Sequence, residues 1–356
     1  MLSPTLLLEC IATVVATAVV SLAVTGQASR FAQKCGAVDA PTGGRKIHQH
    51  TTPLWGGVGI AVTVLLLLGV LAVNGLFSST DLRPMQLIGF VLAVIVLMIG
   101  GALDDRWPLP PIAQLVSPLL ASLIVVLSGT GIIQIADPLH GGLFALDWWR
   151  LGSLSFPADL VTIAWLFLAT YTTKLLDGLD GLVTGIAVIG AGMVGALTLS
   201  PAYFQPSVAL ISSVVGGSFL GFLPRNVHPA KQFLGEAGST LAGFSLGFLA
   251  IVSSAKVAIA LAVLAIPLAD AIIVVVRRML QGSAPWKGDD THLHFRLLRA
   301  GIPHARVVLL LWAVSFAAGI MALSLQTRGK IFLVGTLIVL TALASWAAQR
   351  FARRTH

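Results

Sequence analysis

Two aspartates lie three residues apart between glycines in the segment Lys174-Leu-Leu-Asp177-Gly-Leu-Asp180-Gly181. Side chains with this spacing can share one face of a turn or helix. Carboxylate oxygens are the ligands that Mg²⁺ prefers, and a bound cation neutralises the charge of a diphosphate. A polar reverse turn would have a similar composition. The pair beside Lys174 nevertheless favours a metal–diphosphate site.

Three further segments carry acids or histidines that fit the same chemistry. They are Gly101-Ala-Leu-Asp104-Asp105, Phe233-Leu-Gly-Glu236-Ala-Gly-Ser239 and Asp289-Asp290-Thr-His292-Leu-His294. Each alone has an ordinary explanation, because adjacent acids can form a solvated cap, glycine-rich turns precede helices, and loops carry solvated histidines. Together on one face, the four segments would supply acids for a divalent cation and bases for phosphate groups.

The composition excludes an ordinary soluble domain. Hydrophobic residues make up 56% of the 356 positions and charged residues 10%, and the mean hydropathy is +0.94. Soluble domains carry about a quarter of charged residues. We therefore expect most of the chain to lie in lipid.

Eleven apolar runs are long enough to cross a membrane as helices. A hydrocarbon core about 30 Å thick needs roughly 20 residues per helix, and its backbone groups must pair internally. The runs are 5–25, 56–76, 85–103, 112–133, 158–175, 181–200, 206–223, 239–254, 257–276, 306–325 and 331–349. The prediction is an all-α integral membrane bundle with one domain over 1–356. Its chemically interesting loops are 26–55, 104–111, 174–181, 224–239 and 277–305.

The basic residues predict the orientation of the bundle. Lys and Arg are retained on the cytoplasmic side of a membrane. An external N-terminus and a cytoplasmic C-terminus place 17 of the 22 Lys and Arg residues inside. The four chemical segments fall on that side too. A basic rim facing anionic lipid explains the net charge of +8, so no nucleic-acid partner is expected.

The motifs in this order resemble the polyprenyl-phosphate N-acetylhexosamine-1-phosphate transferase superfamily, of the glycosyltransferase family 4 type. The resemblance covers about residues 40 to 301. Its markers are Thr52-Pro-Leu-Trp-Gly-Gly57, Gly101-Ala-Leu-Asp-Asp105, Asp177-Gly-Leu-Asp-Gly181, His228-Pro-Ala-Lys231 with Phe233-Leu-Gly-Glu-Ala-Gly-Ser239, and His292-Leu-His294. It implies ten or eleven transmembrane helices around a cytoplasmic cleft in the bacterial inner membrane. A homodimer also fits the resemblance.

The resemblance also implies roles for individual residues. The catalytic candidates are Asp104, Asp105, Asp177 and Asp180, of which the first two would position or deprotonate a lipid phosphate. Glu236 and Asp177 would hold the metal, Mg²⁺ or alternatively Mn²⁺. The candidates for substrate binding are Lys46, Lys174, Gly178, Leu179, Asn226, Lys231, Phe233, His292, His294 and Arg299. Within this set Phe233 would stack on uracil.

Several positions depart from the pattern of the superfamily. Glu236 replaces the usual Asp, Tyr171 and Lys174 stand where two Asn are typical, and Phe295 replaces a third His. The basic residue usual after the paired acids appears as Ile112. Glu keeps the carboxylate and Lys174 adds a charge that could meet phosphate. The substitutions therefore preserve the chemistry and leave the sugar open.

The expected reaction is transfer of a sugar-1-phosphate from a UDP-sugar to undecaprenyl phosphate, with release of UMP, as the first step of a cell-envelope glycan. The His292 segment resembles the N-acetylglucosamine-1-phosphate branch and lacks the three consecutive histidines of the muramoyl-pentapeptide branch. Another UDP-N-acetylhexosamine and UDP-muramoyl-pentapeptide stay open as donors, and a covalent role for Asp177 or Asp104 stays open too. A transporter is the alternative from another class. It should carry acids near mid-membrane, where only Glu9 and Asp270 occur.

Overall fold

Apolar runs form the helices of the protein, because a backbone in hydrocarbon must pair its own N–H and C=O groups. The computed structural model describes residues 4–40, 51–78, 80–137, 142–152, 154–253, 257–282 and 291–352. Its α-helices are α1 (Pro4–Cys35), α2 (Gly56–Val73), α3 (Pro84–Arg106), α4 (Val116–Leu127), α5 (Ala158–Leu176), α6 (Leu182–Thr198), α7 (Pro206–Asn226), α8 (Gly235–Val252), α9 (Ala258–Val263), α10 (Ala265–Leu280), α11 (Leu293–Arg299), α12 (His304–Ser324) and α13 (Thr327–Ala352). Two short 3-10 helices, η1 (Ala113–Leu115) and η2 (Pro201–Tyr203), precede α4 and α7.

Each of the eleven predicted apolar runs contains a helix, although the helix in the run 112–133 ends at Leu127. Eight of the described helices, namely α1, α2, α3, α5, α7, α8, α12 and α13, are long and apolar enough to cross a membrane. The runs at α4 and α6 form shorter apolar helices. The ninth run is interrupted at Leu264, where α9 ends and α10 begins. The protein is therefore a largely helical, multi-pass membrane protein.

The predicted loop boundaries were wrong at three places that matter for the site. Residues 26–35 continue α1, Asp104 and Asp105 lie inside the last turns of α3, and Glu236 lies in the first turn of α8. The segment 277–305 contains α11 and the end of α10. A polar residue at a helix end keeps its helical hydrogen bonds, so a hydropathy boundary falls short of the true helix end.

The core lies around α7 and α8, which carry the densest burial of the spanning helices. Five phenylalanines are fully buried there and on α3: Phe90, Phe219, Phe222, Phe244 and Phe248. The outer helices α1, α3 and α13 expose large apolar side chains such as Leu8, Val19 and Phe332. Such surfaces are costly in water and favourable in lipid. They are the lipid-facing side of the bundle.

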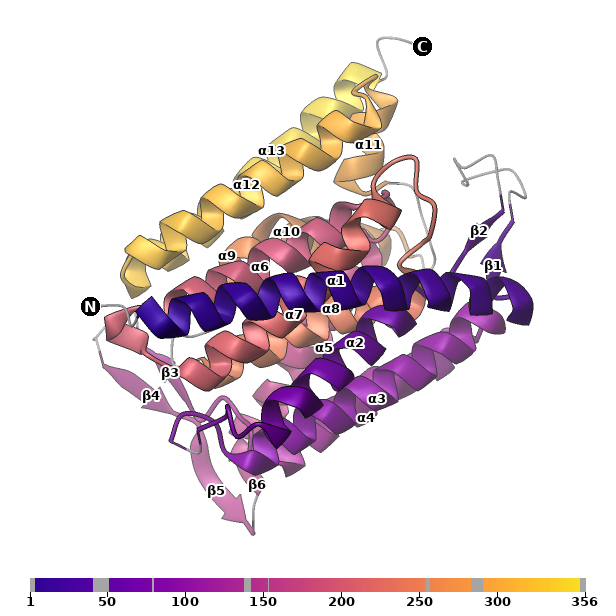
Figure 1. Ribbon diagram of the computed structural model, residues 1–356. Helices are drawn as coiled ribbons and strands as arrows, with labels where there is room; N and C mark the ends of the chain where they lie inside the picture. The colour runs from indigo at the N-terminus through magenta and orange to yellow at the C-terminus, as the bar shows by residue number, and fades with distance from the viewer. Residues whose placement is uncertain are drawn as a thin grey trace.

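Three antiparallel hairpins mark the two ends of the bundle (Figure 1). The pair β1 (Val38–Asp39) and β2 (Thr52–Pro53) lies at the end that also holds α11. The pairs β3 (Gln134–Ala136) with β4 (Leu143–Ala145) and β5 (Asp147–Leu151) with β6 (Leu154–Pro157) lie at the opposite end. The region 134–157 thus forms two hairpins within its described residues. Its Trp148 and Trp149 are exposed, as aromatic residues at a membrane interface are.

Candidate active site

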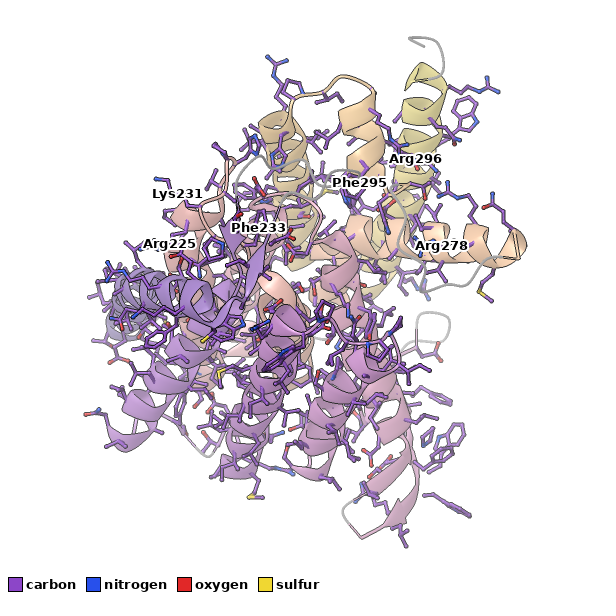
Figure 2. All side chains as sticks on the ribbon, turned by 90° about the vertical axis from the view of Figure 1, so that its right-hand side faces the viewer. Arg225, Lys231, Phe233, Arg278, Phe295 and Arg296 are labelled. Carbon is purple, nitrogen blue, oxygen red and sulfur yellow. The ribbon has the colours of Figure 1, made fainter. Side chains whose placement is uncertain are left out.

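The acids predicted for catalysis gather at the end of the bundle that carries β1, β2 and α11. Three element ends meet there: the C-terminus of α3, the turn between α5 and α6, and the N-terminus of α8. Figure 2 faces this end, with Lys231 and Phe233 on one side and Phe295 and Arg296 on the other. We call it the site end. Because successive helices run in alternating directions, residues that are far apart in the sequence meet at the site end.

The turn between α5 and α6 is tied to the loop after α7. Asp180 Oδ2 lies 2.8 Å from His228 Nδ1 and accepts a hydrogen bond of 3.1 Å from the backbone N–H of Ala230. Asn226 Oδ1 accepts hydrogen bonds from Gly181 N–H (3.1 Å) and from Thr184 Oγ1 (2.6 Å). Asn226 is 4% exposed. It therefore joins the two loops, and its side-chain oxygen is already saturated by protein.

The rings of His228 and His304 stack above Asp180, with centroids 4.1 Å apart and planes at 21°. The ligand atoms of Asp180, His228 and His304 lie within 4.8 Å of one another, which suits a metal ion by distance. However, an imidazole nitrogen binds a metal along its ring plane, and two nearly parallel rings cannot aim at one ion. The stack instead holds the start of α12 against the turn.

Asp105 and Glu236 meet where α3 ends and α8 begins. The Glu236 backbone N–H donates to Asp105 Oδ1 at 2.7 Å. Gly235 before it has φ +74°, and a Cβ there would lie 2.5 Å from Asp105 Oδ2. Glycine is therefore required by both the backbone angle and the close approach. The second oxygen, Asp105 Oδ2, is buried without a hydrogen-bond partner.

Lys174 links this acid pair to α3 and η1. Its Nζ lies 2.6 Å from Glu236 Oε1 and donates to Gln114 Oε1 at 2.8 Å. Gln114 Nε2 donates in turn to Asp104 Oδ1 at 3.3 Å, and Leu109 N–H donates to the same oxygen at 2.6 Å. Asp104 therefore does serve in part as a cap at the end of α3. The negative charge of the acids that Lys174 leaves uncompensated faces the site.

Asp177 ends α5 and lies at the centre of the negative charge. Its residue surface is exposed, yet protein atoms crowd the carboxyl group. This crowding, together with the charges of Glu236, Asp105 and Asp180, raises the pKa of Asp177 to about 8. A carboxyl group among like charges holds its proton until a cation compensates them.

The motif Thr52-Pro-Leu-Trp-Gly-Gly57 clasps the loop before α8. Gly56 N–H and Gly57 N–H donate to the carbonyls of Phe233 (3.1 Å) and Leu234 (2.8 Å). Phe233 N–H donates to the carbonyl of Pro53 at 3.0 Å. The motif therefore positions Phe233 and the start of α8, and its side chains are not placed among the acids.

The histidine segment is anchored by a carboxylate inside the membrane bundle. Asp270 on α10 is 3% exposed, and its oxygens contact His292 Nδ1 (2.9 Å) and Leu293 N–H (2.8 Å). This contact fixes the start of α11. Arg296 fixes the other side of α11 by donating to the Ser345 carbonyl (3.1 Å) and to Gln349 Oε1 (3.0 Å) on α13.

His294 carries this segment to the acidic turn. A Cβ built on Gly178 would lie 2.7 Å from His294 Nε2 and 2.8 Å from the Phe295 ring. His294 is 1% exposed, and neither ring nitrogen has a hydrogen-bond partner. Burial is the main cause that lowers the pKa of His294 to about 4. The ring is neutral at pH 7 and lies directly against the Asp177–Asp180 turn.

An apolar pocket of about 290 Å³ opens beside the acids, between α3 and α4. Most of its lining is aliphatic, as in Val96, Ile99 and Leu120. Asp104, Gln114 and Glu236 form its polar end. Ile99 and Leu120 are about half exposed, at 51% and 48%, so the pocket faces the lipid side of the bundle. It can take an apolar chain with a polar head group.

The other predicted residues are distributed unevenly. Leu179 is buried at 4%, Phe233 is half-buried, and Lys231 and Arg299 are exposed. Arg299 Nε donates to the Phe295 carbonyl at 3.4 Å. Lys46 lies outside the described residues.

Three site residues escaped prediction by sequence or were left without a role. Gln114 joins Asp104 to Lys174, Asp270 holds His292, and His304 stacks on His228. Asp270 gave a signal, because an acid inside a membrane helix needs a partner. Gln114 gave little, since an uncharged side chain after two prolines has no distinctive pattern.

Comparison with known proteins agrees with this geometry. The profile of glycosyl transferase family 4 matches residues 87–254, which span α3 to α8. A probable undecaprenyl-phosphate N-acetylglucosaminyl 1-phosphate transferase of Bacillus subtilis is 30% identical over 89% of this chain and 86% of its own length. The chain belongs to glycosyl transferase family 4.

Two further relatives in this family carry related names. Decaprenyl-phosphate N-acetylglucosaminephosphotransferase of Mycolicibacterium smegmatis is 30% identical, over 85% of this chain and 79% of the relative. Undecaprenyl-phosphate alpha-N-acetylglucosaminyl 1-phosphate transferase of Escherichia coli is 26% identical, over 83% and 77% respectively. The chain thus resembles the N-acetylglucosamine branch along most of its length.

Proposed function

We propose that the protein transfers N-acetylglucosamine-1-phosphate from UDP-N-acetylglucosamine to undecaprenyl phosphate and releases UMP. One observation carries the proposal: Asp105, Asp177 and Glu236 converge beside an apolar pocket that faces lipid. Such a site can hold a charged nucleotide and a lipid phosphate at once. The names of the relatives supply the acceptor lipid and the transferred group.

The proposed topology has eleven membrane crossings, an external N-terminus and a cytoplasmic C-terminus. It is supported by the helices found at all eleven apolar runs and by the 17 of 22 basic residues on one side. The site end would then face the cytoplasm of a bacterium, where UDP-sugars are made. A homodimer in the inner membrane is part of the proposal and rests on resemblance alone.

The acids fit a divalent cation, which we propose to be Mg²⁺ or Mn²⁺. Asp105 Oδ2 is a buried oxygen without a partner, and burial together with the charges of Glu236, Asp105 and Asp180 raises the pKa of Asp177 to about 8. Asp177 and Glu236 would hold the cation, with Asp105 next to them. The bound cation would supply positive charge opposite the phosphates.

In the proposed reaction an oxygen of the acceptor phosphate forms a bond to the β-phosphorus of the UDP-sugar. The bond from that phosphorus to the bridging oxygen breaks, and UMP leaves with this oxygen. Asp104 and Asp105 would position the acceptor phosphate or take its proton. Lys174 and Lys231 would lower the repulsion between the two phosphates, since positioning and electrostatics dominate phosphoryl transfer.

The donor would lie between the Asp177–Asp180 turn and the loop after α7. Gly178, Leu179, Asp180 and Phe233 would form the uridine pocket, which Asn226 shapes by joining the two loops. His292 and His294 would face the sugar and its phosphate. A transporter is disfavoured because Asp270, the one acid we find inside the described core, is engaged by His292 and Leu293.

The test is to identify the lipid product. Purified protein is incubated with undecaprenyl phosphate, Mg²⁺ and one donor at a time, and the lipid fraction is analysed by mass spectrometry. Undecaprenyl diphosphate N-acetylglucosamine is the expected product. A product from another UDP-N-acetylhexosamine or from UDP-muramoyl-pentapeptide alone would move the protein to another branch. Failure to form any lipid diphosphate would refute the proposed reaction.

A further inference from the structure

The ammonium group of Lys174 is held in one place by three neighbours. It lies 2.6 Å from Glu236 Oε1, 2.8 Å from Gln114 Oε1 and 5.2 Å from the centre of the Tyr171 ring. Its side chain is 16% exposed. These neighbours belong to α8, η1 and α5. An ammonium has three N–H groups, so one donor is left after Glu236 and Gln114 are bound.

The remaining donor lies next to the polar end of the apolar pocket. Gln114 and Glu236, the two groups that Lys174 contacts, both line that pocket. A lipid chain lying between α3 and α4 would therefore bring its head group to Lys174. A phosphate head group would bind here through the ammonium of Lys174, because the carboxylates of Asp104 and Glu236 repel an anion.

The segment after Asp104 and Asp105 begins with Arg106, whose guanidinium lies 5.2 Å from the centre of the Trp107 ring, and positions 107–115 carry no basic residue. Ile112, where a basic residue was expected, is 81% exposed and apolar. Gln114 in the same segment instead points at the ammonium of Lys174. The ends of the Gln114 and Lys174 side chains are hydrogen-bonded neighbours. A lysine at either position could place its charge at the same point.

We propose that Lys174 binds the phosphate of the acceptor lipid. A lysine at position 114, in the segment 106–115, could supply the same positive charge in its place. The inference rests on the proposed function, because it presumes a lipid phosphate as the acceptor. It adds the specific group that Lys174 recognises. It also predicts that the lysine and glutamine can exchange places.

A purely structural role would give different behaviour. A lysine that only neutralises Glu236 would affect folding and every ligand alike. A phosphate-binding lysine discriminates between a lipid with a phosphate and the same lipid without one. Hydrogen bonds to charged groups contribute enough for an affinity change of about tenfold or more.

The experiment measures binding of farnesyl phosphate and of farnesol to the full chain in detergent by calorimetry. Lys174→Asn is expected to weaken farnesyl phosphate about tenfold or more and to leave farnesol unchanged. The double variant Gln114→Lys with Lys174→Asn is expected to recover most of the loss. Lys34→Asn, which removes an exposed lysine from the end of α1, is the matched control.

Several results would overturn the inference. They are equal binding of both lipids by the wild type, no effect of Lys174→Asn on farnesyl phosphate, equal weakening of farnesol, and a folded double variant that recovers nothing. Lys174→Gln serves if the Asn variant does not fold, because its amide can still donate to Glu236 and Gln114. Binding is measured without a donor sugar. A protein that binds farnesyl phosphate as expected but releases no UMP would therefore refute the proposed reaction and leave this inference standing.

Discussion

The Nδ1 atom of His292 lies 2.9 Å from Oδ2 of Asp270, and both residues are at least 95% buried. Asp270 also accepts the Leu293 N–H at 2.8 Å. The carboxylate therefore fixes which nitrogen of His292 points away from it. It also begins the helix that carries His294 to the acidic turn. A buried acid in a membrane bundle is costly, and this contact explains its presence.

Replacement of Asp270 by Asn should lower kcat by about tenfold or more, because the amide cannot hold His292 as a carboxylate does. The measurement is kcat, KM and the pH profile of UMP release, and Asp270→Glu should restore part of the loss. Asp81→Asn is the matched control, since Asp81 also accepts two hydrogen bonds but from Ser207 at the other end of the bundle. Equal activities of the two Asn variants in folded protein would contradict this role for Asp270.

Gly178→Ala should reduce activity strongly, because the new Cβ would lie 2.7 Å from His294 Nε2 and push the histidine segment away from the turn. Gly192→Ala is the control, as a Cβ on that residue of α6 meets no atom within 4 Å. The control should be neutral or more stable by up to about 1 kcal/mol. Activity assays and thermal unfolding of both variants test this, and full activity of Gly178→Ala would show that the close contact is unimportant.

The contribution of His294 to the stability of the protein should fall as the pH is lowered from about 6.5 towards 4, opposite in sign to that of Asp177, whose raised pKa lets the folded state hold a proton. Burial lowers the pKa of His294 to about 4 from an ordinary value of 6.5, so in this window the unfolded state binds a proton that the folded state does not. The full effect is on the order of 3 kcal/mol, reached near pH 4. Thermal unfolding followed by tryptophan fluorescence measures it. The stability of His294→Phe relative to the wild type should therefore rise as the pH falls through this window, and a difference that does not change with pH would contradict the prediction.

Binding of Mn²⁺ should tighten as the pH rises towards 8. The pKa of Asp177 is raised to about 8, so below that pH a proton must leave before the carboxylate can bind a cation. The affinity should rise by up to about tenfold per pH unit below 8 and level off above it. Titration followed by electron paramagnetic resonance measures it, with Asp177→Asn as the variant that should lose most of this dependence. A pH-independent affinity in the wild type would exclude Asp177 as a ligand.

Much of the fold could be predicted from the sequence because hydrocarbon leaves the backbone few choices. All eleven apolar runs contain a helix. The break at Leu264 was not predicted, since the residues on either side of it stay apolar. The helix ends near Asp104 and Glu236 were also misplaced, because polar residues there look like loop.

The site was predictable by residue type but not by contact. Asp105 and Glu236 are 131 positions apart, and only the packing of α3 against α8 shows that they share a hydrogen bond. The hydrogen bond between Lys174 and Gln114 was equally hidden, since Gln114 carries no charge. The segment Thr52 to Gly57 was a marker of the resemblance without an assigned role, and in the structure it makes backbone contacts to Phe233 and Leu234.

The central claim is that the converging acids carry out transfer to a lipid phosphate, and UMP release by purified protein tests it most directly. The wild type should release UMP from UDP-N-acetylglucosamine only with undecaprenyl phosphate and Mg²⁺ both present. Glu236→Gln should abolish this release while the protein stays folded and extractable. Release that needs no lipid phosphate, or that survives in Glu236→Gln at the wild-type rate, would contradict the account.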